Sequence, residues 1–202
     1  MKAIFRMLVP FCGLVALATL AHGSEAPKAA APARDAANYV GMKSCGMCHK
    51  SEASGNQLAS WQASPHAKAF EVLATPEAKA TATKLGIADA QASPKCLKCH
   101  STAYDFGETV ATTKITPAEG VTCESCHGPG KGYMAMATMK DPAKAIAGGM
   151  IKPASANCTL CHNDTNPNWK ADRYTLKDGK KVGFDYAQAW EKIKHSDPKL
   201  AK

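Results

Sequence analysis

Cys123-Glu-Ser-Cys126-His127 is one of four segments of this 202-residue chain with the pattern Cys-x-x-Cys-His. On one helical turn, side chains three and four residues apart lie on the same side. The two thiols can therefore reach the vinyl groups at one edge of a haem while the histidine reaches its iron, so each motif predicts one covalently bound c-type haem. The other three motifs are Cys45-Gly-Met-Cys48-His49, Cys96-Leu-Lys-Cys99-His100 and Cys158-Thr-Leu-Cys161-His162.

Zinc sites and disulfides are the alternative roles for these eight cysteines. A zinc site needs paired sets of ligands and rarely has a histidine directly after every second cysteine. A disulfide framework would not need the histidines. The prediction is therefore four haem c groups, and Cys12 is the one cysteine that no motif uses.

The first 23 residues are typical of a secretory signal. Lys2 and Arg6 precede an apolar stretch from Met7 to Leu20, and small residues follow at Ala21 and Gly23. An uncleaved anchor is the alternative, but the apolar stretch is short for a membrane span. We expect a cleaved signal at 1–23, a flexible Ala/Pro-rich leader at 24–38 and a tetrahaem domain at 39–202, without an integral membrane span in the mature chain.

The formal net charge of +8 suggests an acidic or nucleic-acid partner. Cleavage of the signal would remove two basic residues, and the propionates of four haems would offset most of the remaining charge. We therefore expect no nucleic-acid partner. Aromatic residues make up only 6% of the chain, so its own side chains supply a thin core. The predicted fold is mainly α, with sparse secondary structure wrapped around four covalently bound haems.

Each haem iron has a second axial position, whose ligand decides between electron transfer and reaction with small molecules. Outside the motifs and the signal, the histidines are His66 and His195, and we expect both to be distal ligands. Two histidines cannot serve four irons. A thioether of Met139 or Met136 could bind a further iron and raise its potential relative to a bis-histidine haem. The alternative is that these methionines only pack on porphyrin faces.

Several elements are expected between the motifs. Pro65 suits the first turn of a helix and would place His66 at its start. The helix-like stretch 185–194 has an apolar stripe and is followed by His195. The remaining predictions are helices within 56–86 broken at Pro65 and Pro76, a weak strand over 109–115, and a hairpin of 173–176 and 181–184 with its turn at 177–180.

The third motif with its tail, Gly120 to Gly130, together with Ser64 to Phe70 and the four-motif layout, resembles the tetrahaem cytochrome c-554 family. The type member shuttles electrons from hydroxylamine oxidoreductase. The resemblance implies a mostly helical fold around closely stacked haems in a bacterial periplasm. It also implies redox partner proteins as electron donor and acceptor, such as a multihaem oxidoreductase or a membrane quinone-linked cytochrome.

The resemblance further implies a ligand set. The haem on Cys96, Cys99 and His100 would be five-coordinate, and His66 and His195 would serve the third and fourth haems in an order left open. The family's remaining distal histidine, which caps the first haem, follows the Gly-Pro-Gly turn. This chain has methionines there, so its first haem would be His/Met or open.

These features favour an electron carrier with no substrate pocket of its own. An enzyme is the rival hypothesis: an open haem on His100 could bind or reduce nitric oxide or a related nitrogen species. A third hypothesis is a subunit of a respiratory complex or haem filament, in which a neighbouring chain supplies a missing ligand.

Overall fold

The computed structural model describes residues 35–107, 109–112 and 114–196. All of these belong to one compact unit, Pro32–Lys202, whereas the other unit, Met1–Ala31, falls outside the described residues. The predicted signal at 1–23 and most of the predicted leader therefore lie outside the described part. None of the helices described is long and apolar enough to cross a membrane.

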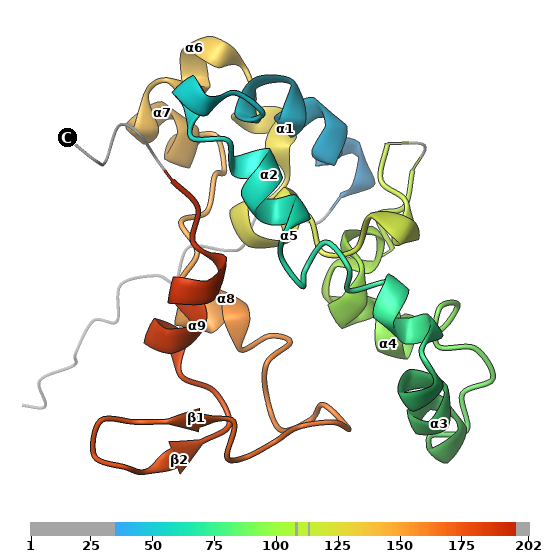
Figure 1. Ribbon diagram of the computed structural model, residues 1–202. Coiled ribbons are helices and arrows are strands. Elements are labelled where there is room, and N and C mark those ends of the chain that lie inside the picture. The colour runs from blue at the N-terminus through green and yellow to red at the C-terminus, as the bar shows by residue number, and fades with distance from the viewer. Residues whose placement is uncertain (1–34, 108, 113, 197–202) are drawn as a thin grey trace, which may run out of the picture. The chain divides into compact units, whose positions relative to one another are not determined.

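Short helices joined by turns make up most of the regular structure (Figure 1). The predicted mainly α fold with sparse secondary structure is confirmed. The α-helices are α1 (Met42–His49), α2 (Gln57–Gln62), α3 (Pro76–Lys84), α4 (Pro94–His100), α5 (Cys123–His127), α6 (Met136–Met139), α7 (Pro142–Ala147), α8 (Ser155–Cys158) and α9 (Tyr186–Ile193). The 3-10 helices are η1 (Ala36–Asn38), η2 (Glu52–Ser54), η3 (Glu71–Ala74), η4 (Thr102–Gly107), η5 (Pro117–Glu119) and η6 (Gly130–Gly132).

The predicted hairpin is confirmed as a two-stranded antiparallel sheet of β1 (Tyr174–Thr175) and β2 (Lys181–Val182), in which Tyr174 pairs with Val182. The strand predicted over 109–115 is wrong for the residues described there. Thr112 and Ile115 exchange backbone hydrogen bonds with each other, so this segment turns back on itself instead of pairing with another strand. Val110 and Ile115 of this segment are nevertheless buried.

The predicted breaks at Pro65 and Pro76 are confirmed. Pro76 begins α3, and the Thr75 hydroxyl accepts a hydrogen bond from the Ala78 amide as its N-terminal cap. No helix begins at Pro65, contrary to the prediction. Residues 64–70 form successive turns instead, because the His66 carbonyl accepts hydrogen bonds from both the Ala69 and Val121 amides and so joins a distant segment.

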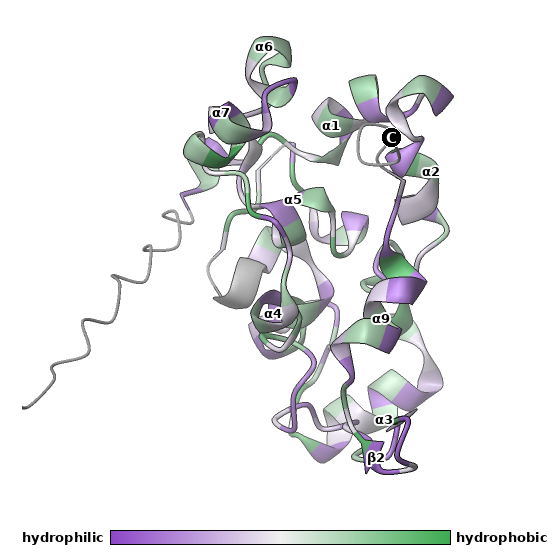
Figure 2. Cartoon of the chain, turned by 90° about the vertical axis from the view of Figure 1, so that its left-hand side faces the viewer, coloured by the Kyte–Doolittle hydropathy of each residue, from purple (hydrophilic) through white to green (hydrophobic). Residues whose placement is uncertain are grey.

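Two small clusters of buried apolar side chains form the core of the described part. Hydrophobic residues are spread over short stretches of many elements (Figure 2). Ala36 in η1 packs on one cluster, so the last residues of the predicted leader are part of the fold. The first cluster is Tyr39, Ala103, Val110 and Ile115, and the second, around α3 and α4, is Leu73, Ala82, Ala90 and Leu97.

Candidate haem sites

Every Cys-x-x-Cys-His motif lies on a helical turn. Helices α1, α4 and α5 each end at the histidine of their motif. The fourth motif begins at the end of α8, and its turn is completed by a hydrogen bond of 2.9 Å from the His162 amide to the Cys158 carbonyl. None of the eight described cysteines forms a disulfide. The two thiols and the imidazole on each turn form the donor set that haem c requires.

Three of the four motif histidines are oriented through Nδ1. This nitrogen lies 3.0 Å from Gln57 Oε1 in His49, 2.7 Å from the Ala69 carbonyl oxygen in His100 and 3.1 Å from the Ile151 carbonyl oxygen in His127. In each case Nδ1–H donates and the oxygen accepts, which leaves Nε2 as the nitrogen that can bind a metal.

The two described histidines outside the motifs each face a motif histidine. The ring centroids of His66 and His162 are 6.1 Å apart, and those of His127 and His195 are 5.9 Å apart. Two imidazoles on opposite sides of one metal ion, with metal–nitrogen bonds of about 2 Å, have centroids about 6 Å apart. The structure therefore brings His66 to the fourth motif and His195 to the third, with a spacing that fits one iron between each pair.

The surroundings of these rings favour the neutral imidazole, which is the form that binds a metal. Burial lowers the pKa of His66, and the neighbouring His162 lowers it further. Burial also lowers the pKa of His127, the hydrogen bond to the Ile151 carbonyl opposes this, and His195 and His49 add smaller contributions that lower it. The pKa of His162 is lowered by burial, Arg173 and His100.

The motifs meet in two pairs through their sulfur atoms. The side chains of Cys45 and Cys123 lie within hydrogen-bonding reach of each other, and this contact lowers the pKa of Cys123. Cys99 and Cys161 are also hydrogen-bonded, and the pKa of Cys99 is lowered to about 7. The first motif therefore lies against the third, and the second against the fourth. Close packing of this kind suits a chain of redox groups.

Glu124, inside the third motif, holds the first pair together. Its side chain is only 1% exposed. One carboxylate oxygen accepts hydrogen bonds from the amides of Val40 at 3.0 Å and Gly130 at 2.7 Å, and the other accepts from the amide of Gly41 at 2.9 Å. The carboxylate thus joins the segment before α1, the third motif and the turn after it.

The backbone of His66 is fixed by the segment that leads into the third motif. The Val121 amide donates to the His66 carbonyl at 3.0 Å, and Trp61 Nε1 donates to the Val121 carbonyl at 2.8 Å. Gly120 has φ +70°, and a Cβ built there would lie 2.7 Å from the His66 carbonyl oxygen. Only glycine permits this approach.

Gly120→Ala is therefore expected to destabilise the fold by about 2–4 kcal/mol, because it combines backbone strain with a clash against the His66 carbonyl. Gly86→Ala is the matched control: Gly86 has φ +66°, but a Cβ there meets nothing within 4 Å. Thermal unfolding of the two variants separates the clash from the strain. Equal losses of stability would show that the contact with His66 contributes nothing.

His195 directly follows the C-terminal end of α9, where the Lys194 amide donates to the Trp190 carbonyl. Gln57 links it to the first motif: Nε2 donates to the Ser196 carbonyl at 2.8 Å, while Oε1 of the same side chain accepts from His49. Gln57 and Glu124 contact the motif segments, and neither was among the site residues expected from the sequence. No local pattern marks Gln57, whereas an acidic residue within a Cys-x-x-Cys motif was a signal that could have been followed.

The methionine prediction concerns α6, which packs mainly on α7. Met136 is 63% exposed, and Met139 is half-buried. Both helices lie at the same end of the unit as α1 (Figures 1 and 2). Methionine ligation of the first haem therefore stays a prediction, and it would need a movement of the Met136 side chain from solvent.

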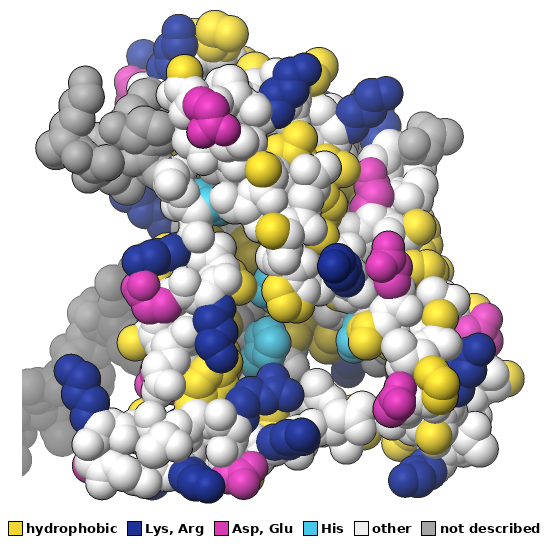
Figure 3. Space-filling view, in the orientation of Figure 1, with side chains coloured by type: hydrophobic (Ala, Val, Ile, Leu, Met, Phe, Trp, Pro, Cys, Tyr) yellow, Lys and Arg dark blue, Asp and Glu magenta, His cyan; other side chains and the backbone are white. Residues whose placement is uncertain are grey.

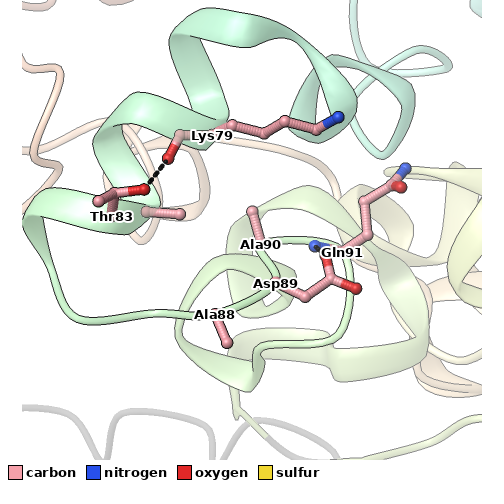
Figure 4. Close-up of a pocket in the computed structure, with 7 residues that line it drawn as sticks. Lys79, Thr83, Ala88, Asp89, Ala90 and Gln91 are labelled. Atoms are coloured by element: carbon pink, nitrogen blue, oxygen red, sulfur yellow. Dashed lines mark hydrogen bonds between the residues drawn. The ribbon is translucent and has the colours of Figure 1, made fainter.

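Histidine side chains lie at the floor of a hollow bordered by hydrophobic side chains, with Lys and Arg side chains around its rim (Figure 3). A separate cavity of about 500 Å³ lies between α3 and the loop that follows it (Figure 4). Its lining, which includes Lys79, Thr83, Asp89 and Gln91, contains no motif residue. This cavity is therefore not one of the haem sites.

Comparison with known proteins agrees with these sites. Residues 44–128, which include the first three motifs, match the family described as cytochrome c554 and c-prime. The chain is 34% identical over 179 residues to cytochrome c-554 of Nitrosomonas europaea, an alignment that covers 79% of this chain and 70% of that protein.

A second relative is similar over a shorter stretch. The chain is 33% identical over 73 residues to the C-type polyheme cytochrome OmcC of Geobacter sulfurreducens, which covers 34% of this chain and 9% of that protein. No solved structure matches the chain significantly. The first alignment covers most of the chain, and the family match includes three of its four motifs. The chain therefore belongs to the cytochrome c-554 family of multihaem c-type cytochromes, which act in electron transfer.

Proposed function

We propose that this chain carries four c-type haems and passes electrons between redox partner proteins in the periplasm, after export directed by residues 1–23. The main support is the spacing of the two histidine pairs, 6.1 Å for His66 and His162 and 5.9 Å for His127 and His195. Haem iron bound at these motifs would supply reversible one-electron oxidation and reduction. An iron held by His66 and His162, or by His127 and His195, would have no open position, which favours electron transfer over chemistry with a substrate.

The residues around the motifs support fast transfer in this proposal. Cys45 meets Cys123 and Cys99 meets Cys161, so the groups attached to each pair of motifs would be neighbours. Lysine and arginine side chains around the hollow of Figure 3 would face an electron donor or acceptor. Charges in such positions raise the association rate more than the affinity.

A second function is favoured by the surroundings of His49 and His100, the other two motif histidines. Within the described residues, neither His49 nor His100 is in ring contact with a second imidazole, although His49 is near enough to lower the pKa of His127 and His100 that of His162. An iron held by His100 would then have an open position at which a small nitrogen species such as nitric oxide could bind. A ligand from a neighbouring chain in a respiratory or filament assembly is the third possibility, and spectral change on dilution would reveal it.

The visible spectrum of the purified, dithionite-reduced protein, recorded before and after addition of carbon monoxide, tests these functions. We expect a haem content of four per chain and absorption typical of haem c. A spectrum that shifts with the gas would indicate a reachable open iron and favour the second function. An unshifted spectrum would favour the electron carrier, and a protein without haem absorption would refute both.

Met139→Ala and Met136→Ala test the ligation of the first haem. If one of these thioethers binds iron, its removal is expected to lower one midpoint potential and leave the other three nearly unchanged, because a thioether ligand favours the reduced state. Spectroelectrochemical titration of each variant measures this. Met134→Ala completes the series in the same segment, and titrations that are unchanged in all three variants would eliminate methionine ligation.

A further inference from the structure

His162 differs from the other three motif histidines in how its ring is held. Within the described residues, no hydrogen bond is recorded to either of its ring nitrogens, whereas Nδ1 of His49, His100 and His127 has an oxygen partner. Instead, Phe184 stacks on the His162 ring, with centroids 5.6 Å apart and ring planes only 16° from parallel. His66 approaches the same imidazole with its ring plane at 66°.

Phe184 is itself fixed by the C-terminal hairpin. Tyr174 in β1 packs edge-on against it, with centroids 6.2 Å apart and ring planes at 83°. Trp169 lies against Gly183 so closely that no side chain would fit at that glycine. On the other side, the Asp185 side chain caps α9 by accepting a hydrogen bond from the Gln188 amide. Both chain neighbours of Phe184 are thus fixed, and its ring has little freedom to move.

We propose that Phe184 is the positioning residue for His162 and sets the rotation of this imidazole by stacking, as an oxygen acceptor does for the other three. A ring packed against the face of an imidazole blocks rotation about the metal–nitrogen axis and excludes water from that side. The Phe184 ring does not attract the Nδ1 proton of His162 as an oxygen acceptor would. The His162 imidazole is therefore a weaker electron donor than the imidazoles of the other three motif histidines. The hairpin thereby acts on one haem through a side chain that binds no metal. This inference rests on the proposed pairing of His66 and His162 at one iron.

Phe184→Leu in the haem-loaded protein tests the proposal by electron paramagnetic resonance and by spectroelectrochemical titration. The angle between the two axial imidazole planes governs the anisotropy of a low-spin ferric signal. We expect the signal that His66→Ala removes to broaden or move in Phe184→Leu, and the midpoint potential of that haem to fall as water gains access to it. The other three haems are expected to keep their signals and potentials. Phe184→Tyr, which retains the ring, is expected to restore both properties.

Val182→Ala is the matched control, because it removes apolar volume from β2 without removing the ring that touches His162. Equal changes in Val182→Ala and Phe184→Leu would show that the hairpin is only structural and would overturn the proposal. Unchanged spectra and potentials in Phe184→Leu would also overturn it. If that variant does not accumulate, Phe184→Met removes the ring with less loss of volume and is judged by the same outcomes.

The unsubstituted protein separates this inference from the proposed function. If it lacks a low-spin signal that depends on His66, the pairing of His66 with His162 is wrong and the positioning role fails with it. If that signal is present and Phe184→Leu leaves it unchanged, only the positioning role fails.

Discussion

His66→Ala is expected to convert one of the four haems from low spin to high spin. His66 is half-buried, its pKa is lowered by burial and by the neighbouring His162, and its ring centroid lies 6.1 Å from that of His162, so it is suited to hold an iron together with that residue. Removal of a strong nitrogen ligand leaves a five-coordinate iron and raises its midpoint potential, because the imidazole stabilises the ferric state. Optical and magnetic resonance spectra of the oxidised protein measure the change, and carbon monoxide should bind to the new open position after reduction.

Lys68→Ala is the matched control. Lys68 lies on the same turn as His66, but its charged side chain is not expected to bind a haem iron. His195→Ala provides an independent comparison. Because His195 faces His127, its loss should convert a different haem, and the double variant should show both changes together. If His66→Ala leaves the low-spin spectrum unaltered, His66 is not a ligand and its pairing with His162 has no functional meaning.

Glu124→Ala is expected to destabilise the protein by about 4 kcal/mol, because it leaves three buried amide donors without an acceptor. These are the amides of Val40, Gly41 and Gly130. Glu124→Gln should cost about half as much. One amide oxygen can still accept from Val40 and Gly130, but the amide nitrogen would face the Gly41 donor. Denaturant unfolding of the haem-loaded protein, followed by haem absorption, measures both losses.

Glu119→Ala is the control for the removal of a nearby carboxylate. Glu119 is half-buried and completes a capping box at η5 by accepting from the Thr116 amide, so its loss should cost about 1 kcal/mol. A Glu124→Ala variant no less stable than Glu119→Ala would show that the buried carboxylate does not hold the first and third motifs together.

Local elements were predictable where a few neighbouring residues determine the backbone. The hairpin follows from Lys177-Asp-Gly-Lys180, in which Gly179 has φ +83° and Asp178 accepts a hydrogen bond from the Lys180 amide. Helix α9 follows from its Asp185 cap and its apolar stripe. The strand expected over 109–115 was wrong because alternation of apolar residues does not specify a pairing partner. Here the Val110 amide donates to the Ala103 carbonyl in η4 instead.

The sequence by itself determined the haem-binding motifs, the mainly α class and the family, since a Cys-x-x-Cys-His motif acts within one helical turn. It could not determine which motif each distal histidine faces. His66 and His162 are 96 positions apart, and their approach depends on long-range contacts, including the hydrogen bond from the Val121 amide to the His66 carbonyl. The roles of Gln57, Glu124 and Phe184 likewise depended on the tertiary structure. Each acts by contact with a segment remote in the chain, and sequence spacing does not encode such contacts.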